Sequence, residues 1–143
     1  MKEFIPGIIL SLIGLVLLLL VDSQIYGGVM NLNMMILCLA LHVFLLRLFL
    51  VDRRWVMYSI FITVFPILLF FSIPDLTQQQ AMDKAVALHQ IEIKETSKVL
   101  TNGIDDWNPF NSYNAYHFKG TAGEEEMSVI VIPDSGRVFV IDE

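Results

Sequence analysis

Three long apolar segments occupy the first half of the sequence, at Phe4–Val21, Val29–Val51 and Trp55–Ile73. Each is long enough to cross a membrane, because a spanning helix needs about 17–25 predominantly apolar residues for a core roughly 30 Å thick. The first segment exceeds the roughly 7–15 apolar residues of a signal peptide, and two more follow it, so we expect it to be retained. Trp55 and Tyr58, at the start of the third segment, and Tyr26, in the link after the first, fit aromatic anchors at the membrane interface. The pattern therefore predicts three membrane-spanning helices.

Basic residues that flank these segments predict their orientation. Arg53 and Arg54 lie in the link between the second and third segments, with Arg47 close to the same end, whereas residues 22–28 contain no basic residue. Basic residues of short loops stay preferentially in the cytoplasm. We therefore expect a multi-pass protein of the cell membrane with a cytoplasmic N-terminus and with everything after Pro74 outside the cytoplasm.

The pattern changes after Pro74, where polar residues become frequent and a further helix is predicted to begin. Thr77 and Gln80 have the spacing of a capping box, in which each side chain binds a backbone N–H of the first helical turn. Apolar residues then recur at helical spacing. We expect this helix to continue through residues 99–100, until the Asn-Gly pair at 102–103 ends it.

Alternating apolar and polar residues near the end of the sequence predict three short strands. They lie at Tyr113–Phe118, Met127–Ile132 and Arg137–Ile141, separated by an acidic turn at Lys119–Glu126 and a tight turn at Pro133–Gly136. One helix packed on a three-stranded antiparallel sheet would bury the apolar faces of both. The sequence thus predicts a small α+β domain after the spans.

The composition divides the chain into two domains. Of its 143 residues, 55% are hydrophobic and 17% are charged, whereas soluble domains have about 45–50% and about 25%. Five basic and twelve acidic residues follow Pro74. We therefore expect an integral membrane α-helical domain at residues 1–74 and an acidic extracytoplasmic α+β domain at residues 75–143. This composition excludes a soluble enzyme, and the absence of a basic face excludes a nucleic-acid-binding protein. A disulfide scaffold is excluded because Cys38 is the only cysteine.

A stripe of small residues runs along the first predicted span. Gly7, Ser11 and Gly14 recur at intervals of four and three residues, which places them on one helix face. Small residues let the backbones of two membrane helices approach closely. We favour packing within the three-helix unit over the alternative, in which the stripe is a face for a partner protein.

Polar residues in the second predicted span form a second stripe. Asn31, Cys38 and His42 are spaced so that they share one helix face. A thiol and an imidazole one turn apart could share a metal or relay protons, but two ligands do not complete a metal site. We favour hydrogen bonding to neighbouring helices, which is the usual role of such residues in spans. We therefore expect no bound metal and no other cofactor.

The segment before the first predicted strand is the best candidate for contacting a partner. Trp107 and Phe110 lie among turn-forming residues at Asp105–Ser112, and aromatic side chains often dominate the energetics of protein interfaces. The sequence contains neither the motif of an activated nucleophile nor a glycine-rich phosphate loop. We therefore expect a protein that is not an enzyme.

The second domain resembles a PepSY-type domain over residues 76–143. The resemblance rests on Ala81 and Ala85 in the predicted helix and on the closing sequence Val129–Val138, where an apolar strand leads into an Asp-Ser-Gly-Arg-Val turn. It implies an extracytoplasmic regulatory or inhibitory module of the kind often attached to membrane helices. No catalytic residue carries over, because the pattern of that family is structural.

Two functions remain open. In the first, the chain is a membrane-anchored, non-catalytic protein whose outer domain binds or restrains a membrane or extracytoplasmic partner protein. In the second, it is a small accessory subunit of a membrane transport or redox complex, with Asn31, Cys38 and His42 as its polar path. We favour the first, because the sequence lacks catalytic groups and ends in a PepSY-like pattern. The lipid bilayer is a partner in both.

Overall fold

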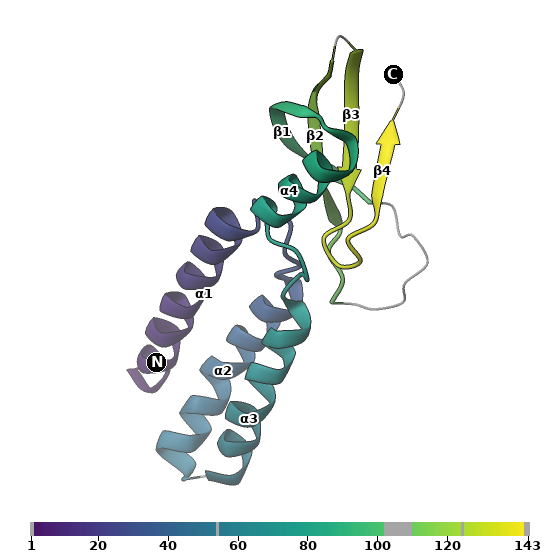
Figure 1. Cartoon of the computed structure of the whole chain (residues 1–143). Coiled ribbons are helices and arrows are strands. Elements are labelled where there is room, and N and C mark those ends of the chain that lie inside the picture. Colours follow the sequence, from purple (N-terminus) through teal and green to yellow (C-terminus); the bar gives the residue numbers. More distant parts are fainter. Residues whose placement is uncertain (1, 54, 102–109, 124, 142–143) are drawn as a thin grey trace. The chain divides into compact units, whose positions relative to one another are not determined.

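The structure is a computed structural model (Figure 1), and it describes residues 2–53, 55–101, 110–123 and 125–141. The chain divides into two compact units, each of which draws on two stretches of sequence. Unit 1 comprises Met1–Val21 and Asn31–Ile73, and unit 2 comprises Asp22–Met30 and Pro74–Glu143. Unit 2 therefore combines the link between the first two predicted spans with the domain that follows the third.

Unit 1 is built from three long apolar helices. A short 3-10 helix, η1 (Lys2–Phe4), leads into α1 (Ile5–Ile25), which is followed by α2 (Asn33–Asp52) and α3 (Trp55–Ser72). Each of the three is long and apolar enough to cross a membrane. Many of their large apolar side chains are exposed, and extensive exposed apolar surface is typical of contact with a membrane or partner. The predicted spans are thus present as helices, although α2 begins at Asn33 rather than Val29.

Unit 2 is an α+β domain. One helix is followed by four strands that pair in sequence order as an antiparallel sheet: α4 (Gln78–His89), β1 (Glu92–Leu100), β2 (Asn114–Ala122), β3 (Glu125–Val131) and β4 (Val138–Ile141). The predicted capping box is confirmed, because Thr77 Oγ1 accepts the N–H of Gln80 while Gln80 Oε1 accepts the N–H of Thr77. Figure 1 shows α4 lying along one face of the sheet.

The prediction of three strands is wrong, because the segment after α4 is a fourth strand and not more helix. Gln90 adopts a left-handed conformation with φ of 52° and ends α4 at His89, without the glycine that usually marks such an end. β1 then pairs with β2, with Thr96 opposite Phe118. Isoleucine, threonine and valine in β1 favour a strand, but their spacing of three residues also fits a helical face.

The turn between β2 and β3 is much shorter than the predicted turn at Lys119–Glu126. Both strands extend into that range until Ala122 pairs with Glu125. Gly123, with φ of 68°, follows β2 directly, and glycine adopts this left-handed conformation without steric cost. A tight hairpin connection thus replaces the predicted acidic turn.

The core of unit 2 lies between α4 and the sheet. Ala81 and Ala85 are fully buried on α4, where their small side chains let the helix approach the strands closely. The buried cluster also contains residues from the strands and their flanks, namely Ile91, Tyr116, Phe118, Val129 and Val131. Val29 from the link between α1 and α2 is fully buried in the same cluster. The link is therefore an integral part of the α+β core.

Candidate functional site

The small-residue stripe of α1 packs against α2. A Cβ atom added at Gly7 would lie 3.0 Å from Val43 Cα, and one at Gly14 would lie 3.3 Å from Leu39 Cδ2. Ser11, between them, is buried and donates its hydroxyl hydrogen to the Leu39 carbonyl oxygen at 2.9 Å. The geometry favours packing within the three-helix unit, as small residues permit close helix contact in a membrane.

His42 links all three helices of unit 1. Its Nδ1 lies 2.9 Å from Ser11 Oγ on α1, and its Nε2 lies 3.2 Å from the Tyr58 hydroxyl on α3. Its ring also stacks on Phe61, with the ring centroids 5.6 Å apart. The hydrogen bonds to Ser11 and Tyr58 are of the kind that we expected for this residue, since they join neighbouring helices.

The hydrogen-bond pattern is consistent with a neutral imidazole. Since Ser11 donates its only hydrogen to Leu39, the Nδ1 of His42 carries a hydrogen that it donates to the serine oxygen. In a neutral ring Nε2 is then the acceptor, and the Tyr58 hydroxyl at 3.2 Å can donate to it. Each polar side-chain atom in this chain of contacts, from Ser11 through His42 to Tyr58, therefore has a hydrogen-bond partner within the three helices.

The other two residues of the predicted polar stripe do not join this network. Asn31 precedes α2 instead of lying on it, and its Oδ1 accepts the N–H of Asn33 at 3.2 Å. Cys38 is buried on α2 and lines an apolar groove between α2 and α3. In the part of the chain that the structure describes, no three His, Cys, Asp or Glu residues gather as a metal site would require. A continuous polar path through all three residues is therefore not formed on α2.

The arginines that predict orientation have distinct local roles. Arg47 forms an ion pair with Glu3 at 3.4 Å, and its guanidinium carbon lies 5.5 Å from the ring centroid of Phe4. Arg53 adopts a left-handed conformation with φ of 52° and caps α2, its N–H donating to the Leu48 carbonyl oxygen. Arg54 lies outside the described residues. Within unit 1, the start of the chain and the end of α2 are thus tied together by the side chain of Arg47.

The link between α1 and α2 is fastened into unit 2 by specific polar contacts. The carboxylate of Asp22 accepts the N–H of Met30 at 3.0 Å, and the Asp22 carbonyl accepts the N–H of Gly28 at 3.0 Å. From β1, Lys98 Nζ donates to the Gly28 carbonyl oxygen at 3.1 Å. Together with the burial of Val29, these bonds give the link a defined conformation within the α+β unit.

Tyr116 is the largest side chain buried beside the link. Its hydroxyl donates to the Leu76 carbonyl oxygen at 3.1 Å, and only 1% of the residue is exposed. Burial is the main reason that the pKa of this phenol lies well above its ordinary value. The neighbouring Tyr26, Asp22 and Asp134 raise the pKa further, because a negative charge disfavours formation of a phenolate nearby. Sequence analysis places Tyr116 in a strand but gives no sign of this environment.

The predicted partner-binding loop has both of its ends fastened to the sheet domain. Before the loop, the N–H of Thr101 donates to the Tyr113 carbonyl oxygen at 2.8 Å. After it, Asp134 accepts two hydrogen bonds from Ser112, one from the backbone N–H at 2.7 Å and one from the hydroxyl at 3.2 Å. Phe110 is half-buried, and Trp107 lies outside the described residues.

A histidine that the sequence did not single out bridges three strands. Nδ1 of His117 on β2 lies 3.0 Å from Ser97 Oγ on β1, and its Nε2 is hydrogen-bonded to the hydroxyl of Ser128 on β3. Two serine hydroxyls can satisfy both nitrogens of an imidazole. We therefore assign these contacts to cross-strand stabilisation of the sheet.

Comparison with known proteins adds no assignment. A scan against models of protein families, a search of curated proteins and a search of solved structures each found no match to this chain. The resemblance of residues 76–143 to a PepSY-type domain stays a prediction, and the function is argued from the geometry.

Proposed function

We infer that this chain is a membrane-anchored, non-catalytic interaction protein whose α+β unit binds or restrains an extracytoplasmic partner. The observation that carries this proposal is that Asp22–Met30 belongs to the same compact unit as Pro74–Glu143. A domain joined to its anchor by one linker would move freely, as is usual between domains with a small interface. Here the chain enters the domain both after α1 and after α3, so two connections and not one join the domain to the three helices.

The same observation supports the proposed orientation. If α2 and α3 each cross the bilayer, Asp22–Met30 and Pro74–Glu143 are separated by two crossings and lie on the same side. The compact packing of these two stretches requires a common side. Arg47 lies in the second half of α2 and Arg53 caps its C-terminal end, in the link to α3, and the positive-inside rule assigns such a link to the cytoplasm. The α+β unit is accordingly extracytoplasmic in this proposal.

The loop that contains Trp107 and Phe110 is the proposed contact with the partner. Ser112 donates two hydrogen bonds to Asp134, and Thr101 donates one to Tyr113, and these bonds hold the two ends of this loop against the sheet. Fixing the ends of a loop before binding reduces the entropy lost on association. Aromatic residues in such a position are typical anchors of an interface.

Photo-crosslinking in the native membrane tests the proposed contact. A photoreactive residue at Trp107 or Phe110 of the full-length chain should give the same discrete crosslinked product in repeated experiments. Leu88 on α4 is 58% exposed and is a matched control site, from which we expect no such product. The same product from all three positions, or no product from the two loop positions, would contradict the proposal.

Thiol labelling of whole cells tests the orientation separately. In a chain with Cys38→Ser, a membrane-impermeant reagent should label Ser135→Cys, in the turn before β4, and should label Asp52→Cys, at the exposed end of α2, only after the cells are opened. The opposite pattern would place the α+β unit in the cytoplasm and would remove the basis for an extracytoplasmic partner.

A further inference from the structure

An apolar groove of about 350 Å³ lies within unit 1 and is lined by residues of α1, α2 and α3. α1 contributes residues between Leu10 and Val21, and α3 contributes residues between Phe61 and Leu69. Two residues of α2 complete the lining. The groove therefore runs along about three turns of α1.

The lining of this groove does not suit water. Among the described residues that form it, His42 alone has a polar side chain, and its two ring nitrogens are hydrogen-bonded to Ser11 and Tyr58. A buried water needs about two to four polar partners, and a cavity lined by leucine, isoleucine and phenylalanine stays dry and takes up apolar molecules. We therefore expect an apolar occupant.

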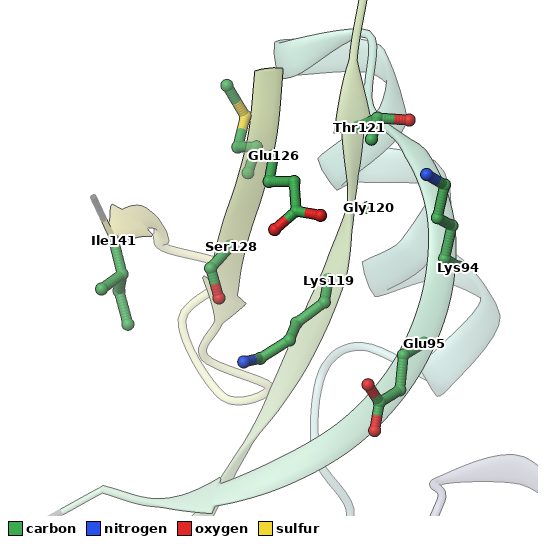
Figure 2. Close-up of a pocket in the computed structure, with 9 residues that line it drawn as sticks. Lys94, Glu95, Lys119, Gly120, Thr121, Glu126, Ser128 and Ile141 are labelled. Carbon is green, nitrogen blue, oxygen red and sulfur yellow. The ribbon is translucent and has the colours of Figure 1, made fainter. Parts of the chain in front are cut away.

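A pocket on the sheet of unit 2 has a lining of the opposite kind. Figure 2 shows the charged side chains of Lys94, Glu95, Lys119 and Glu126 around it. Charged groups favour a hydrated environment, because removing an ion from water costs much free energy. The groove of unit 1, in contrast, offers an occupant almost purely apolar contact.

The size of the groove matches one hydrocarbon chain. A cavity of about 150 Å³ holds benzene, so in proportion 350 Å³ accommodates roughly 14 carbon atoms. Leu10 and Val21 lie about 16 Å apart along α1, and one leaflet of a bilayer contributes about 15 Å of hydrocarbon. Both the volume and the length thus correspond to a single lipid acyl chain.

A helix of a partner protein is too large for the same space. A helix about 16 Å long has roughly 11 residues, and its backbone alone contains roughly 40 atoms. Such a helix could place only individual side chains in the groove and would leave voids between them, which is unfavourable. A flexible chain can fill the groove continuously.

The groove is continuous with the exposed apolar surface of the three helices, the surface that meets lipid in the proposed function. Of its lining residues, Leu10, Leu17 and Ile62 are exposed, whereas Leu39 and Phe61 are buried. None of the described residues that line it is charged. A chain in the surrounding lipid therefore meets no polar barrier at the entrance of the groove.

We propose that this groove holds one acyl chain of a membrane phospholipid, an inference that rests on the membrane anchorage proposed above. The chain packs against leucine and phenylalanine side chains and covers the ring of His42. It gains no hydrogen bond there, because both ring nitrogens have partners within the three helices. The groove thus selects the lipid by its chain and not by its headgroup.

Native mass spectrometry of the full-length chain tests the proposal. The chain is extracted in mild detergent from nanodiscs of palmitoyl-oleoyl phosphatidylcholine, and we expect one retained phospholipid per chain. Nanodiscs of palmitoyl-oleoyl phosphatidylglycerol should give the same retention, since only the headgroup differs. Added dihexanoyl phosphatidylcholine should not replace the retained lipid, because a chain of six carbons fills less than about half of the groove.

Matched variants locate the site. Leu18→Trp on α1 and Ile62→Trp on α3 each enlarge a lining residue and should lower retention at least about tenfold, as overpacking of this size typically does. Leu19→Trp and Ile67→Trp change exposed residues of the same helices outside the groove and should retain the lipid as the wild type does. Circular dichroism of each variant shows whether the helices are intact.

Three results would overturn the proposal. They are the absence of retained phospholipid on the folded wild-type chain, its ready replacement by dihexanoyl phosphatidylcholine, and equal retention in the groove variants and their controls. Each leaves the crosslinking at Trp107 and Phe110 and the thiol-labelling pattern unchanged. Failure of this site is therefore distinguishable from failure of the proposed function.

Discussion

Ser11 on α1 and His42 on α2 are joined by a hydrogen bond of 2.9 Å between Oγ and Nδ1. The other nitrogen of His42 continues the contact to the Tyr58 hydroxyl on α3. In lipid, apolar side chains give little drive for helix association, and interhelical hydrogen bonds contribute instead. The side chain of His42 therefore connects α2 to both α1 and α3 by hydrogen bonds.

His42→Leu should lower the free energy of unfolding of unit 1 by about 1 kcal/mol, the typical scale of interhelical hydrogen bonds in membranes. Unfolding in mixed micelles, followed by circular dichroism, measures this change. His42→Gln is the matched control, because its side-chain amide supplies both a donor and an acceptor, and it should recover part of the loss. A variant at residue 42 that folds normally but abolishes a transport or redox activity would instead favour the accessory-subunit hypothesis.

Gly7→Ala should disrupt the packing of α1 on α2 more than Gly14→Ala does. The new methyl group at Gly7 would lie 3.0 Å from the backbone of Val43, which cannot move without shifting the helix. At Gly14 the nearest atom is the end of the flexible Leu39 side chain, at 3.3 Å. We expect a loss of about 1–3 kcal/mol at Gly7, as for overpacking in a core, and less at Gly14. Unfolding in mixed micelles measures both, and equal losses would contradict the packing described.

Local patterns in the sequence were sufficient to predict part of the fold. The spans follow from the length and composition of the apolar segments, and the start of α4 follows from Thr77 and Gln80, which are close in sequence. The end of α4 could not be predicted, since Gln90 is an ordinary residue in a left-handed conformation. Residues 92–100 become a strand because β2 offers a partner, and tertiary pairing commonly overrides local periodicity.

The candidate sites depended still more on contacts between distant residues. Ser11 and His42 were each recognised within a stripe, but nothing in the sequence indicated that the two stripes meet. The position of Tyr58 fits an aromatic anchor at the membrane interface, so the sequence did not indicate its contact with His42. Val29 has the apolar character of a spanning segment, and it is buried because it packs against side chains of elements more than forty residues later. The periodicity of a short stretch of sequence does not indicate such contacts between distant residues.

Val29→Ala should destabilise unit 2 although the residue lies between α1 and α2. Val29 is fully buried among side chains of the α+β core. Removing its two methyl groups leaves a cavity, and we expect a loss of about 2 kcal/mol. Hydrogen exchange of the β2 and β3 amides in the full-length chain measures the change.

Val86→Ala on α4 is the matched control, since Val86 is 42% exposed and its truncation should change stability by less than about 0.5 kcal/mol. Equal exchange in wild type and Val29→Ala would show that the link is not part of the core.

The environment of Tyr116 predicts that unit 2 loses stability in alkaline solution. Burial raises the pKa of this phenol in the folded chain above the unfolded value of about 10. Above that pH the folded state binds more protons than the unfolded state, so the free energy of unfolding falls as the pH rises. Below about pH 10 both states are protonated, and the contribution of this residue to stability is complete.

Tyr116→Phe separates this titration from the packing of the ring. The variant loses the hydrogen bond to the Leu76 carbonyl oxygen, so at neutral pH we expect it to be less stable by about 1 kcal/mol. It should also lose less stability than the wild type between about pH 10 and pH 12, because no phenol titrates at that position. Denaturant unfolding across this range measures both effects.

Tyr113→Phe is the control, because Tyr113 is 54% exposed, and it should keep the wild-type pH dependence. Parallel pH profiles for wild type and Tyr116→Phe would show that the buried phenol is not the source of the alkaline loss.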